Sequence, residues 1–428
     1  MTPHDVLAQP FALPCGVVVK NRLMKSAMSE ALSNREGLVT PELVTLYGQW
    51  AQGGIGLCVT GNVMIDRHAL GEPGNVVIED ERDLDGLRRW AQAATAHGTQ
   101  CWVQLNHPGK QAPKGLNKET VAPSAVGFRP EMAAFFKVPR ALEDIEVHAL
   151  IARFGRAAGV VKQAGFSGVQ IHAAHGYLVS QFLSPHHNQR TDEWGGTPEK
   201  RRRFLLAVYA AMREAVGPDF PIGVKLNSAD FQRGGFTEEE SLDAIRALAE
   251  AGVDLIEISG GTYEAPAMTG VKEKAKEKAN GLPMKDSTRQ REAYFLAFAE
   301  KARQAVRTPL VVTGGFRTAQ GMAEAIQSGA VDMVGLARAL AIEPGLPLRL
   351  LAGKAAQHVV RPVKTGIGAI DKLGIMEITW YTGQLKRIGQ GGQARPNESA
   401  LWVFLKFAAK QAMAGRKKRK PTKLRASA

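Results

Sequence analysis

The sequence predicts an α/β fold, a (β/α)8 TIM barrel followed by a C-terminal helical extension and a basic tail. Eight short runs rich in valine, isoleucine and leucine occur in the first 336 residues, and helical patterns separate nearly all of them. These runs do not alternate with polar residues, which is typical of parallel strands covered on both faces. An open doubly wound sheet would need a Gly-x-Gly-x-x-Gly turn after an early strand, and the sequence has none. We therefore expect a barrel over 1–345, a helical extension over 346–414 and a disordered tail over 415–428.

The expected strands are short, and most are bounded by Gly, Pro or Asn, which are typical of turns. A length of about five residues and the enrichment in β-branched side chains favour strands over buried helices. In chain order we expect strands at Leu23–Ala27, Gly56–Thr60, Cys101–Leu105, Gly168–Ile171, Pro221–Leu226, Asp254–Ser259, Pro309–Thr313 and Asp332–Leu336.

The segments between these runs carry helix start and stop signals. Thr40 and Pro41 begin one helix, which Gly53 ends. Thr237 and Glu240 form a capping box at the start of another. The expected helices are Pro41–Gln52, Glu81–His97, Val147–Ala164, Pro198–Val216, Thr237–Ala251, Ser287–Val306 and Thr318–Ser328, with Ile370–Ile388 and Ser399–Met413 in the extension.

The net charge of +14 is concentrated in the C-terminal region. Residues 353–428 contain 16 Lys and Arg against three acids, so they carry +13, and the first 352 residues carry only +1. A nucleic-acid-binding fold would place its basic face on the domain itself, so we expect no nucleic-acid partner. The apolar stripe Leu401–Ala409 and the basic run Arg416–Lys420 allow weak contact with an anionic membrane surface. A helix docked on the barrel or on a second subunit, trailing a solvated tail, is the simpler interpretation.

Cysteine usage indicates a reduced cytoplasmic protein. Cys15, Cys58 and Cys101 are odd in number and form neither a CxxC pair nor a zinc or iron–sulfur pattern. No apolar stretch approaches the ~18–20 residues of a membrane span. The N-terminal residues lack the basic and apolar regions of a signal peptide.

The ends of the last two strands predict an anion site. Gly314 and Gly315 follow the seventh strand, and Ala337 and Arg338 follow the eighth. Glycines expose backbone N–H groups, an arginine adds a bidentate charge, and a short helix after the last strand would point its N-terminus at a phosphate. The loops after strands seven and eight are the frequent phosphate site of this barrel. Ordinary turn glycines with a surface arginine are the structural alternative.

A second cluster follows the fourth strand, at His172, His175 and Tyr177. Neutral imidazoles can donate hydrogen bonds to a carbonyl oxygen, and a tyrosine hydroxyl can donate a proton, which together suit reduction of an enone. Two alternatives stay open. The histidines could bind a metal with Asp192 and the neighbouring His186 and His187, or one of them could be a hydrogen-bonded core residue.

Polar residues interrupt two other apolar strands. Gln104 ends the third strand, and Lys225 lies inside the fifth. An amide can pair with both an N–H and a carbonyl of a planar ring, and an ammonium suits the part of an isoalloxazine that becomes anionic on reduction. A polar network in the barrel floor is the structural alternative.

These motifs resemble those of the old yellow enzyme family, the NADH:flavin oxidoreductases or FMN-dependent ene-reductases. The segment HAAHGYLVSQFLSPHHNQRTDEWGG at His172–Gly196 resembles the family signature. The resemblance spans Phe11 to Pro344. Further similar segments occur in the expected order: KNRLMKSAMSE, GGIGLCVTGNV, QLNHPGKQ, KLNSADF, VTGGFRT and GLARAL.

The resemblance implies non-covalent FMN in a TIM barrel, NADH or NADPH as hydride donor, and an activated alkene that takes hydride at its β-carbon. It implies that His172 and His175 hold the substrate oxygen and that Tyr177 protonates the α-carbon. Family members often pair, so a homodimer is possible. The resemblance places the flavin against Ala27, Met28, Ser29, Asn62, Gln104 and Lys225, and its phosphate against Gly314, Gly315, Ala337 and Arg338.

Three positions depart from the family pattern. Lys225 replaces an arginine of many members, which keeps the charge but loses bidentate contact. Ser29 replaces threonine or cysteine, and Ala31 replaces a tyrosine of one subgroup. A metal-dependent barrel hydrolase or lyase using His172 and His175, and a non-catalytic flavin carrier, are the competing hypotheses.

Overall fold

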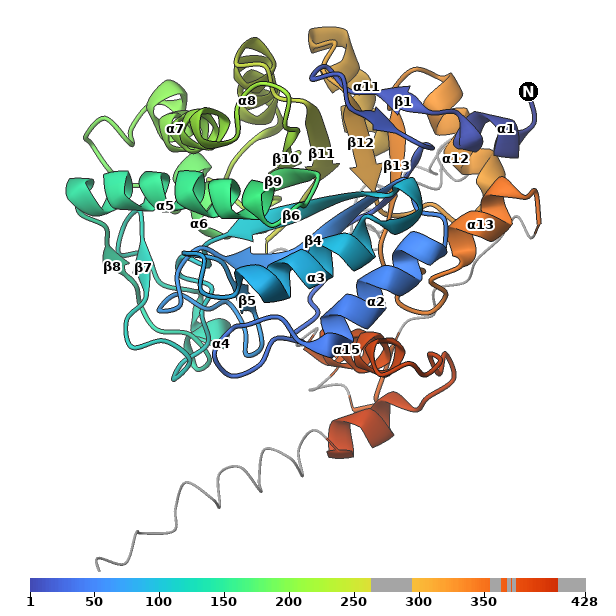
Figure 1. Cartoon of the computed structure of the whole chain (residues 1–428). Helices are drawn as coiled ribbons and strands as arrows, with labels where there is room; N and C mark the ends of the chain where they lie inside the picture. The colour runs from blue at the N-terminus through green and yellow to red at the C-terminus, as the bar shows by residue number, and fades with distance from the viewer. Residues whose placement is uncertain (263–294, 355–362, 368–370, 372–374, 407–428) are drawn as a thin grey trace, which may run out of the picture.

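Eight parallel strands close into a barrel in the computed structural model, which describes residues 1–262, 295–354, 363–367, 371 and 375–406 (Figure 1). Each strand pairs in parallel with the next, and β3 closes the ring by pairing with both β4 and β13. This arrangement confirms the predicted (β/α)8 barrel. The strands are β3 Leu23–Lys25, β4 Leu57–Met64, β6 Gln100–Asn106, β9 Gly168–Ala173, β10 Ile222–Asn227, β11 Leu255–Ser259, β12 Leu310–Thr313 and β13 Met333–Leu336.

Helices follow the strands and form the outer layer (Figure 1). The helices expected at Pro41–Gln52 and Pro198–Val216 have the predicted bounds, and each begins at a Thr–Pro pair, which favours a helix start. The helices that follow strands around the barrel are α2 Pro41–Gln52, α3 Leu84–Ala94, α5 Asp144–Gln163, α7 Pro198–Val216, α8 Glu238–Glu250, α11 Leu296–Ala305, α12 Ala319–Gln327 and α13 Leu346–Leu351.

Strand β4 differs from the prediction in a way that shapes the site. We expected it to end at Thr60, with Gly61 and Asn62 in a turn. It instead continues to Met64 through an irregularity in its pairing with β6 between Val59 and Asn62. A Cβ on Gly61 would lie 2.5 Å from the Met28 carbonyl oxygen, so glycine is required for this close approach. The irregularity keeps Asn62 in the strand and beside Gln104.

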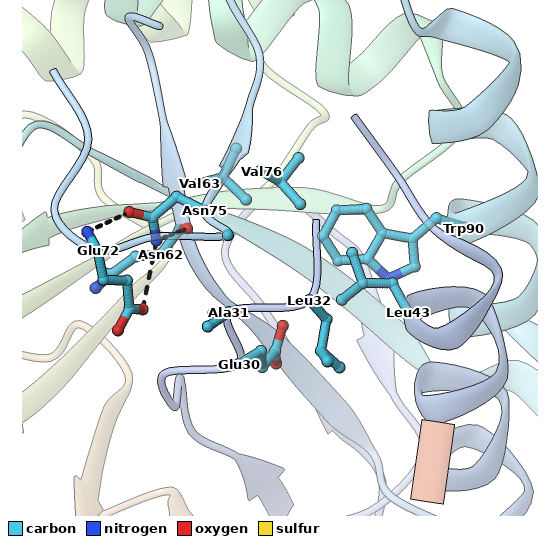
Figure 2. A pocket seen from close by; sticks show the side chains of 12 residues that line it. Glu30, Ala31, Leu32, Leu43, Asn62, Val63, Glu72, Asn75, Val76 and Trp90 are labelled. Atoms are coloured by element: carbon cyan, nitrogen blue, oxygen red, sulfur yellow. Dashed lines mark hydrogen bonds between the residues drawn. The ribbon is translucent and has the colours of Figure 1, made fainter. Parts of the chain in front are cut away.

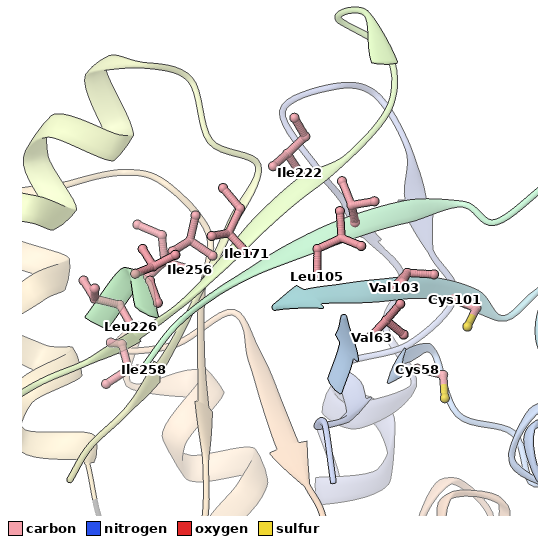
Figure 3. Packing of buried hydrophobic residues seen from close by; sticks show 14 of the residues in the cluster. Cys58, Val63, Cys101, Val103, Leu105, Ile171, Ile222, Leu226, Ile256 and Ile258 are labelled. Carbon is pink, nitrogen blue, oxygen red and sulfur yellow. The ribbon is translucent and has the colours of Figure 1, made fainter. Parts of the chain in front are cut away.

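The core has two parts. Outward-facing strand residues such as Val103, Ile171 and Ile256 belong to the main apolar cluster, which includes the inner faces of the helices (Figure 3). A smaller cluster collects strand residues around Trp102 together with Leu13 and Val19 of the N-terminal segment. There β1 (Phe11–Ala12) pairs antiparallel with β2 (Val18–Val19). The small cluster consists of Leu13, Val19, Met24, Leu57, Val59, Trp102, Leu255, Val311 and Met333.

The described part of the extension packs against the barrel. Helix α15 (Ile375–Gly389) packs against α2, and residues 400–406 are helical with Leu401, Trp402 and Leu405 exposed (Figure 1). The basic tail, the remaining residues of the helix expected at Ser399–Met413 and the first part of the helix expected at Ser287–Val306 lie outside the described residues. No helix in the described ranges is long and apolar enough to cross a membrane.

Candidate active site

A layer of buried polar side chains crosses the interior of the barrel. Glu257 of β11 is its centre and is fully buried. Its Oε1 lies 3.0 Å from Lys225 Nζ and accepts from the Ser26 and Thr313 hydroxyls at 2.5 and 2.7 Å. Its Oε2 accepts from Gln170 Nε2 at 2.9 Å. The two oxygens of one carboxylate therefore join residues from four other strands or strand ends.

The electrostatics of this layer favour a charged pair. Burial alone would raise the pKa of Glu257, but the Lys225 ammonium and the hydrogen bonds from its neighbours hold that pKa below its ordinary value. The carboxylate therefore stays ionised at neutral pH. The polar network that the sequence allowed as an alternative role for Gln104 and Lys225 is present. Lys225 contacts Glu257, and Gln104 Nε2 donates to Gln170 Oε1 at 2.7 Å.

The two histidines of the signature meet above this layer. His172 lies at the end of β9 and His175 in the turn that follows, with His172 Nε2 3.3 Å from His175 Nδ1. Their rings are nearly perpendicular, at 84°. Burial holds the pKa of both imidazoles well below its ordinary value, and the Lys225 charge lowers it further. Both rings are therefore neutral at physiological pH.

Hydrogen bonds determine the tautomer of each ring. An amide oxygen can only accept, so Nδ1–H of His172 donates to Asn62 Oδ1 at 2.9 Å. His172 Nε2 is then an acceptor, and Nδ1–H of His175 donates to it. The remaining nitrogen of His175, Nε2, accepts from the Ser259 hydroxyl at 2.7 Å. The N–H of His175 therefore points into the gap between the rings, where a ligand oxygen could replace His172 as its acceptor.

The backbone of His175 is held in an uncommon conformation. Its φ is +62°, in the left-handed region that costs a residue other than glycine roughly 1–3 kcal/mol. The Asn227 side chain accepts from its N–H at 3.1 Å, and Gln111 Nε2 donates to its carbonyl at 2.9 Å. These two buried side chains stabilise the turn, so the position of the imidazole depends on the surrounding tertiary structure.

Tyr177 completes the cluster. It precedes α6 (Leu178–Leu183), is 6% exposed, and its ring centroid lies 4.6 Å from that of His172. Asn62 Nδ2 donates to its hydroxyl at 3.3 Å. The Asn62 amide therefore bridges His172 and Tyr177, and its orientation determines which hydrogen each of them can offer. The structure brings these three predicted site residues and Asn62 into direct contact.

A buried ion pair supports the strand that carries Asn62. Lys25 Nζ lies 3.2 Å from Glu30 Oε1 and donates to the Val59 carbonyl at 2.8 Å, and Lys25 is completely buried. The Tyr47 hydroxyl donates to the same carboxylate oxygen at 2.5 Å and accepts from the Gly61 N–H at 3.0 Å. These contacts hold the first residue of the irregular stretch of β4, Val59, and Gly61 within it, and so fix its path.

The segment Ala27–Ser29 leaves β3 and lies against β4 at Gly61. The Ser29 hydroxyl donates to the Glu72 carboxylate. Asn75 Nδ2 is shared between Glu72 Oε1 and the Asn62 carbonyl, both at 3.4 Å, as the dashed lines of Figure 2 show. Glu30, Glu72 and Asn75 line a small pocket beside Asn62. Burial raises the pKa of Glu72.

The residues predicted to bind an anion lie at two neighbouring strand ends, because β12 and β13 pair directly. Gly314 and Gly315 have φ of +115° and +83°, which glycine adopts freely. Arg338 is paired with Glu377 of α15 at 2.6 Å, so the extension reaches this site. The short helix expected directly after β13 is not there. Residues 338–342 form turns, and α13 begins only at Leu346.

Sequence reasoning missed several residues of the site, among them Glu257, Gln170 and Ser259. A usable signal existed for the first two, because each interrupts an apolar strand in the same way as Gln104 and Lys225. Ser259 had none, since its partner His175 is 84 residues away in the sequence. It follows that its role depends on two strand ends meeting in the barrel.

The metal alternative is not favoured. Among the described residues, the side chains that could share an ion form one group, the exposed Asp144, His148 and Glu193. Asp192, the expected third ligand, is paired with Arg190 instead. The two signature histidines use their facing nitrogens for each other.

The chemistry of the site fits FMN. Gln104 is 1% exposed, and no hydrogen bond between described residues uses its Oε1, so this oxygen is available to accept a ring N–H. Lys225 places an ammonium in the same layer, and the Gly314–Gly315 turn with Arg338 suits a phosphate.

Comparisons with known proteins agree with this geometry. Residues 7–357 match the model of the NADH:flavin oxidoreductase / NADH oxidase family. The chain is 39% identical over 359 residues to NADH-dependent flavin oxidoreductase iliE of Hypocrea jecorina, which covers 79% of this chain and 87% of that one. It is 37% identical to the protein of the same name from a Neonectria species over 79% of its own length, but spans only 46% of that relative.

Solved structures show the same relationship. The old yellow enzyme homologue from Zymomonas mobilis superposes with a TM-score of 0.69 at 25% identity, over 83% of this chain and 94% of that one. The chain belongs to the NADH:flavin oxidoreductase / NADH oxidase family, which makes it an oxidoreductase of the old yellow enzyme type with FMN and a nicotinamide as cofactors.

Proposed function

We propose that this enzyme takes hydride from NADH or NADPH and reduces the C=C bond of an α,β-unsaturated carbonyl compound, with both substrates using one site in turn in a ping-pong mechanism. The observation that carries the proposal is the contact of neutral His172 with both neutral His175 and Tyr177 beside the polar layer of the barrel. Neutral imidazoles donate to a carbonyl oxygen without introducing charge, and a phenol supplies the proton that the reduced carbon needs.

His175 is the primary donor to the substrate oxygen in this proposal. Its Nδ1–H already faces the gap between the rings, and Ser259 holds the tautomer that makes this possible. His172 can add a second donor at Nε2 when the Asn62 amide turns its Nδ2 toward His172 Nδ1. Two N–H groups would then converge on one oxygen and polarise the conjugated double bond.

Tyr177 protonates the α-carbon in this proposal. Its hydroxyl lies next to Asn62 on the same face as the histidines, and burial excludes bulk water as a competing acid. FMN, held in place by side chains of this barrel, supplies the two-electron carrier that accepts hydride from the nicotinamide and delivers it to the β-carbon. We assign its ring to Ala27, Met28, Ser29, Asn62, Gln104 and Lys225, and its phosphate to Gly314, Gly315, Ala337 and Arg338.

The test is an absorbance experiment on the purified, FMN-loaded protein. Bands near ~370 and ~450 nm should bleach on anaerobic addition of NADH or NADPH and return on addition of 2-cyclohexenone. The nicotinamide that bleaches them faster is the preferred donor. A flavin that bleaches but is not reoxidised by any α,β-unsaturated carbonyl compound would refute the alkene part of the proposal.

Arg338 tests the phosphate assignment. Arg338→Ala removes the guanidinium charge next to the glycine turn and should weaken FMN retention, measured as flavin occupancy after dialysis. Glu377→Gln is the matched control, because it breaks the same ion pair but keeps the arginine. Equal flavin loss from both variants would assign the effect to α15 rather than to the phosphate.

We further propose a cytoplasmic enzyme that forms a homodimer, with the barrel over 1–345 and the extension over 346–414 as its parts. Leu401, Trp402 and Leu405 are exposed, which suits either a second subunit or weak contact with a membrane surface. Light scattering and co-sedimentation with anionic liposomes, each with and without the residues after Ala400, separate these. Identical behaviour of the two forms would remove both roles for this segment.

A further inference from the structure

The buried carboxylate beneath the proposed flavin position has no counterpart in the chemistry described so far. We propose that Glu257 sets the electron affinity of the bound FMN, by neutralising Lys225 and by fixing, through Gln170, the direction in which Gln104 presents its amide. The inference rests on the proposed placement of the flavin ring over Gln104 and Lys225.

The charge argument starts from distance and burial. Lys225 Nζ and Glu257 Oε1 are 3.0 Å apart, and the side chains are 5% and 0% exposed. Lys225 alone would favour a reduced flavin, because the reduced ring is anionic and the oxidised ring is neutral. A carboxylate in contact with the ammonium opposes this preference. The pair therefore presents little net charge to the ring, and the flavin is a stronger reductant than with the lysine alone.

The second argument concerns hydrogen-bond direction. A carboxylate oxygen only accepts, so Gln170 must turn its NH2 toward Glu257, at 2.9 Å. Gln170 Oε1 then accepts from the Gln104 NH2, at 2.7 Å. This leaves Gln104 Oε1 to face the ligand as an acceptor. The N3–H group of a flavin is a donor in both redox states, so the relay selects a matching orientation.

Burial makes this relay rigid. Gln104, Gln170 and Glu257 are all at most 1% exposed, so water cannot exchange with their partners or let the amides rotate freely. Ser26 and Thr313 donate to the other oxygen of the same carboxylate, Oε1. Every group that faces Glu257 thus donates to it, which is the arrangement expected for a permanent negative charge.

The central experiment is the two-electron midpoint potential of FMN in Glu257→Gln, measured by equilibration with a reference dye on the loaded protein. We expect the potential to rise by about 30 mV or more, which corresponds to a tenfold gain in affinity for reduced over oxidised FMN. The dissociation constants of oxidised and reduced FMN from the same variant provide an independent measurement. Thr313→Val is the control, because it removes a hydrogen bond to the carboxylate but keeps its charge.

A double variant tests compensation directly and protects against misfolding of the single one. Lys225→Gln should lower the potential, and Lys225→Gln combined with Glu257→Gln should return it close to the wild-type value. A double variant whose potential equals that of Lys225→Gln alone would overturn the charge argument. So would an unchanged or lowered potential in Glu257→Gln.

The relay has its own probe. FMN methylated at N3 cannot donate to Gln104 Oε1, so the wild type should bind FMN more tightly than 3-methyl-FMN. Gln170→Leu leaves the Lys225–Glu257 pair intact and should reduce this preference severalfold; an unchanged preference would overturn the relay. Failure of the wild type to bind FMN at all would instead overturn the proposed function, so the two failures are distinguishable.

Discussion

Replacing Tyr177 by phenylalanine removes one hydroxyl and separates proton donation from every other role of this residue. The ring is 6% exposed and packs 4.6 Å from the His172 ring centroid, and phenylalanine keeps this contact. The hydrogen bond from Asn62 that this change removes is long, at 3.3 Å. A bond of this kind contributes about 1 kcal/mol, so losing it would change the rate by roughly fivefold.

Loss of the proton donor has a larger effect. A positioned general acid contributes about a hundred- to ten-thousand-fold to rate, or roughly 3–5 kcal/mol of barrier. Hydride transfer from the nicotinamide needs no proton from Tyr177. We therefore expect Tyr177→Phe to slow alkene reduction at least about a hundredfold and to leave flavin reduction within about fivefold of the wild type.

Anaerobic stopped-flow absorbance near ~450 nm measures both half-reactions separately, first with NADH or NADPH and then with 2-cyclohexenone. Tyr209→Phe is the matched control, because Tyr209 is 4% exposed but lies on α7, away from the histidines. Equal slowing of the two half-reactions would refute proton donation by Tyr177. Slowing of alkene reduction by less than about fivefold would do the same, because loss of the Asn62 hydrogen bond would explain it.

Three further predictions follow from contacts around the site. Ser259→Ala should weaken 2-cyclohexenone binding by about two- to tenfold, because the hydrogen bond that fixes the His175 tautomer, of about 0.5–1.5 kcal/mol, is lost. Titration of the flavin spectrum with 2-cyclohexenone measures this, and unchanged binding would contradict it. Because folding lowers the pKa of His172 and His175, only the unfolded chain takes up their protons, so the free energy of unfolding should fall as pH falls below about 6.5. The alkene half-reaction should show no titration near that pH. Urea unfolding and stopped-flow at several pH values test the two parts. Lys25→Met should lower the free energy of unfolding in urea by about 3–5 kcal/mol, because it leaves Glu30 buried without its cation. Adding Glu30→Gln should recover part of that loss. Equal stability of Lys25→Met and the wild type would refute the role of the pair.

Local signals in the chain were sufficient for most of the barrel. Thr–Pro starts placed α2 and α7 correctly, and apolar runs located all eight barrel strands. The end of strand β4 was predicted too early, because Gly61 and Asn62 are typical of a turn. The close approach of Met28 and the pairing with β6 extend that strand, and neither is visible from local sequence.

The predicted site shows the same division. The spacing of His172, His175 and Tyr177 after a strand was enough to predict a cluster, because a strand end and one turn bring such residues together. The Asn62 contacts and the Ser259 hydrogen bond join positions 84 to 115 residues apart. Sequence spacing cannot specify those contacts, since they depend on the order in which strands meet around the barrel.

The sequence by itself determined the alternation of strands and helices, the family resemblance and the residue types of the site, because propensity, capping and apolar periodicity are local properties. Tertiary structure alone decided the charge state and direction of the groups. The sequence alone shows that Lys225 and Gln104 are polar residues in apolar strands. Only closure of the barrel places Glu257 against Lys225 and Gln170 against Gln104. The low dielectric of the interior then makes the charge of the pair and the direction of each amide specific.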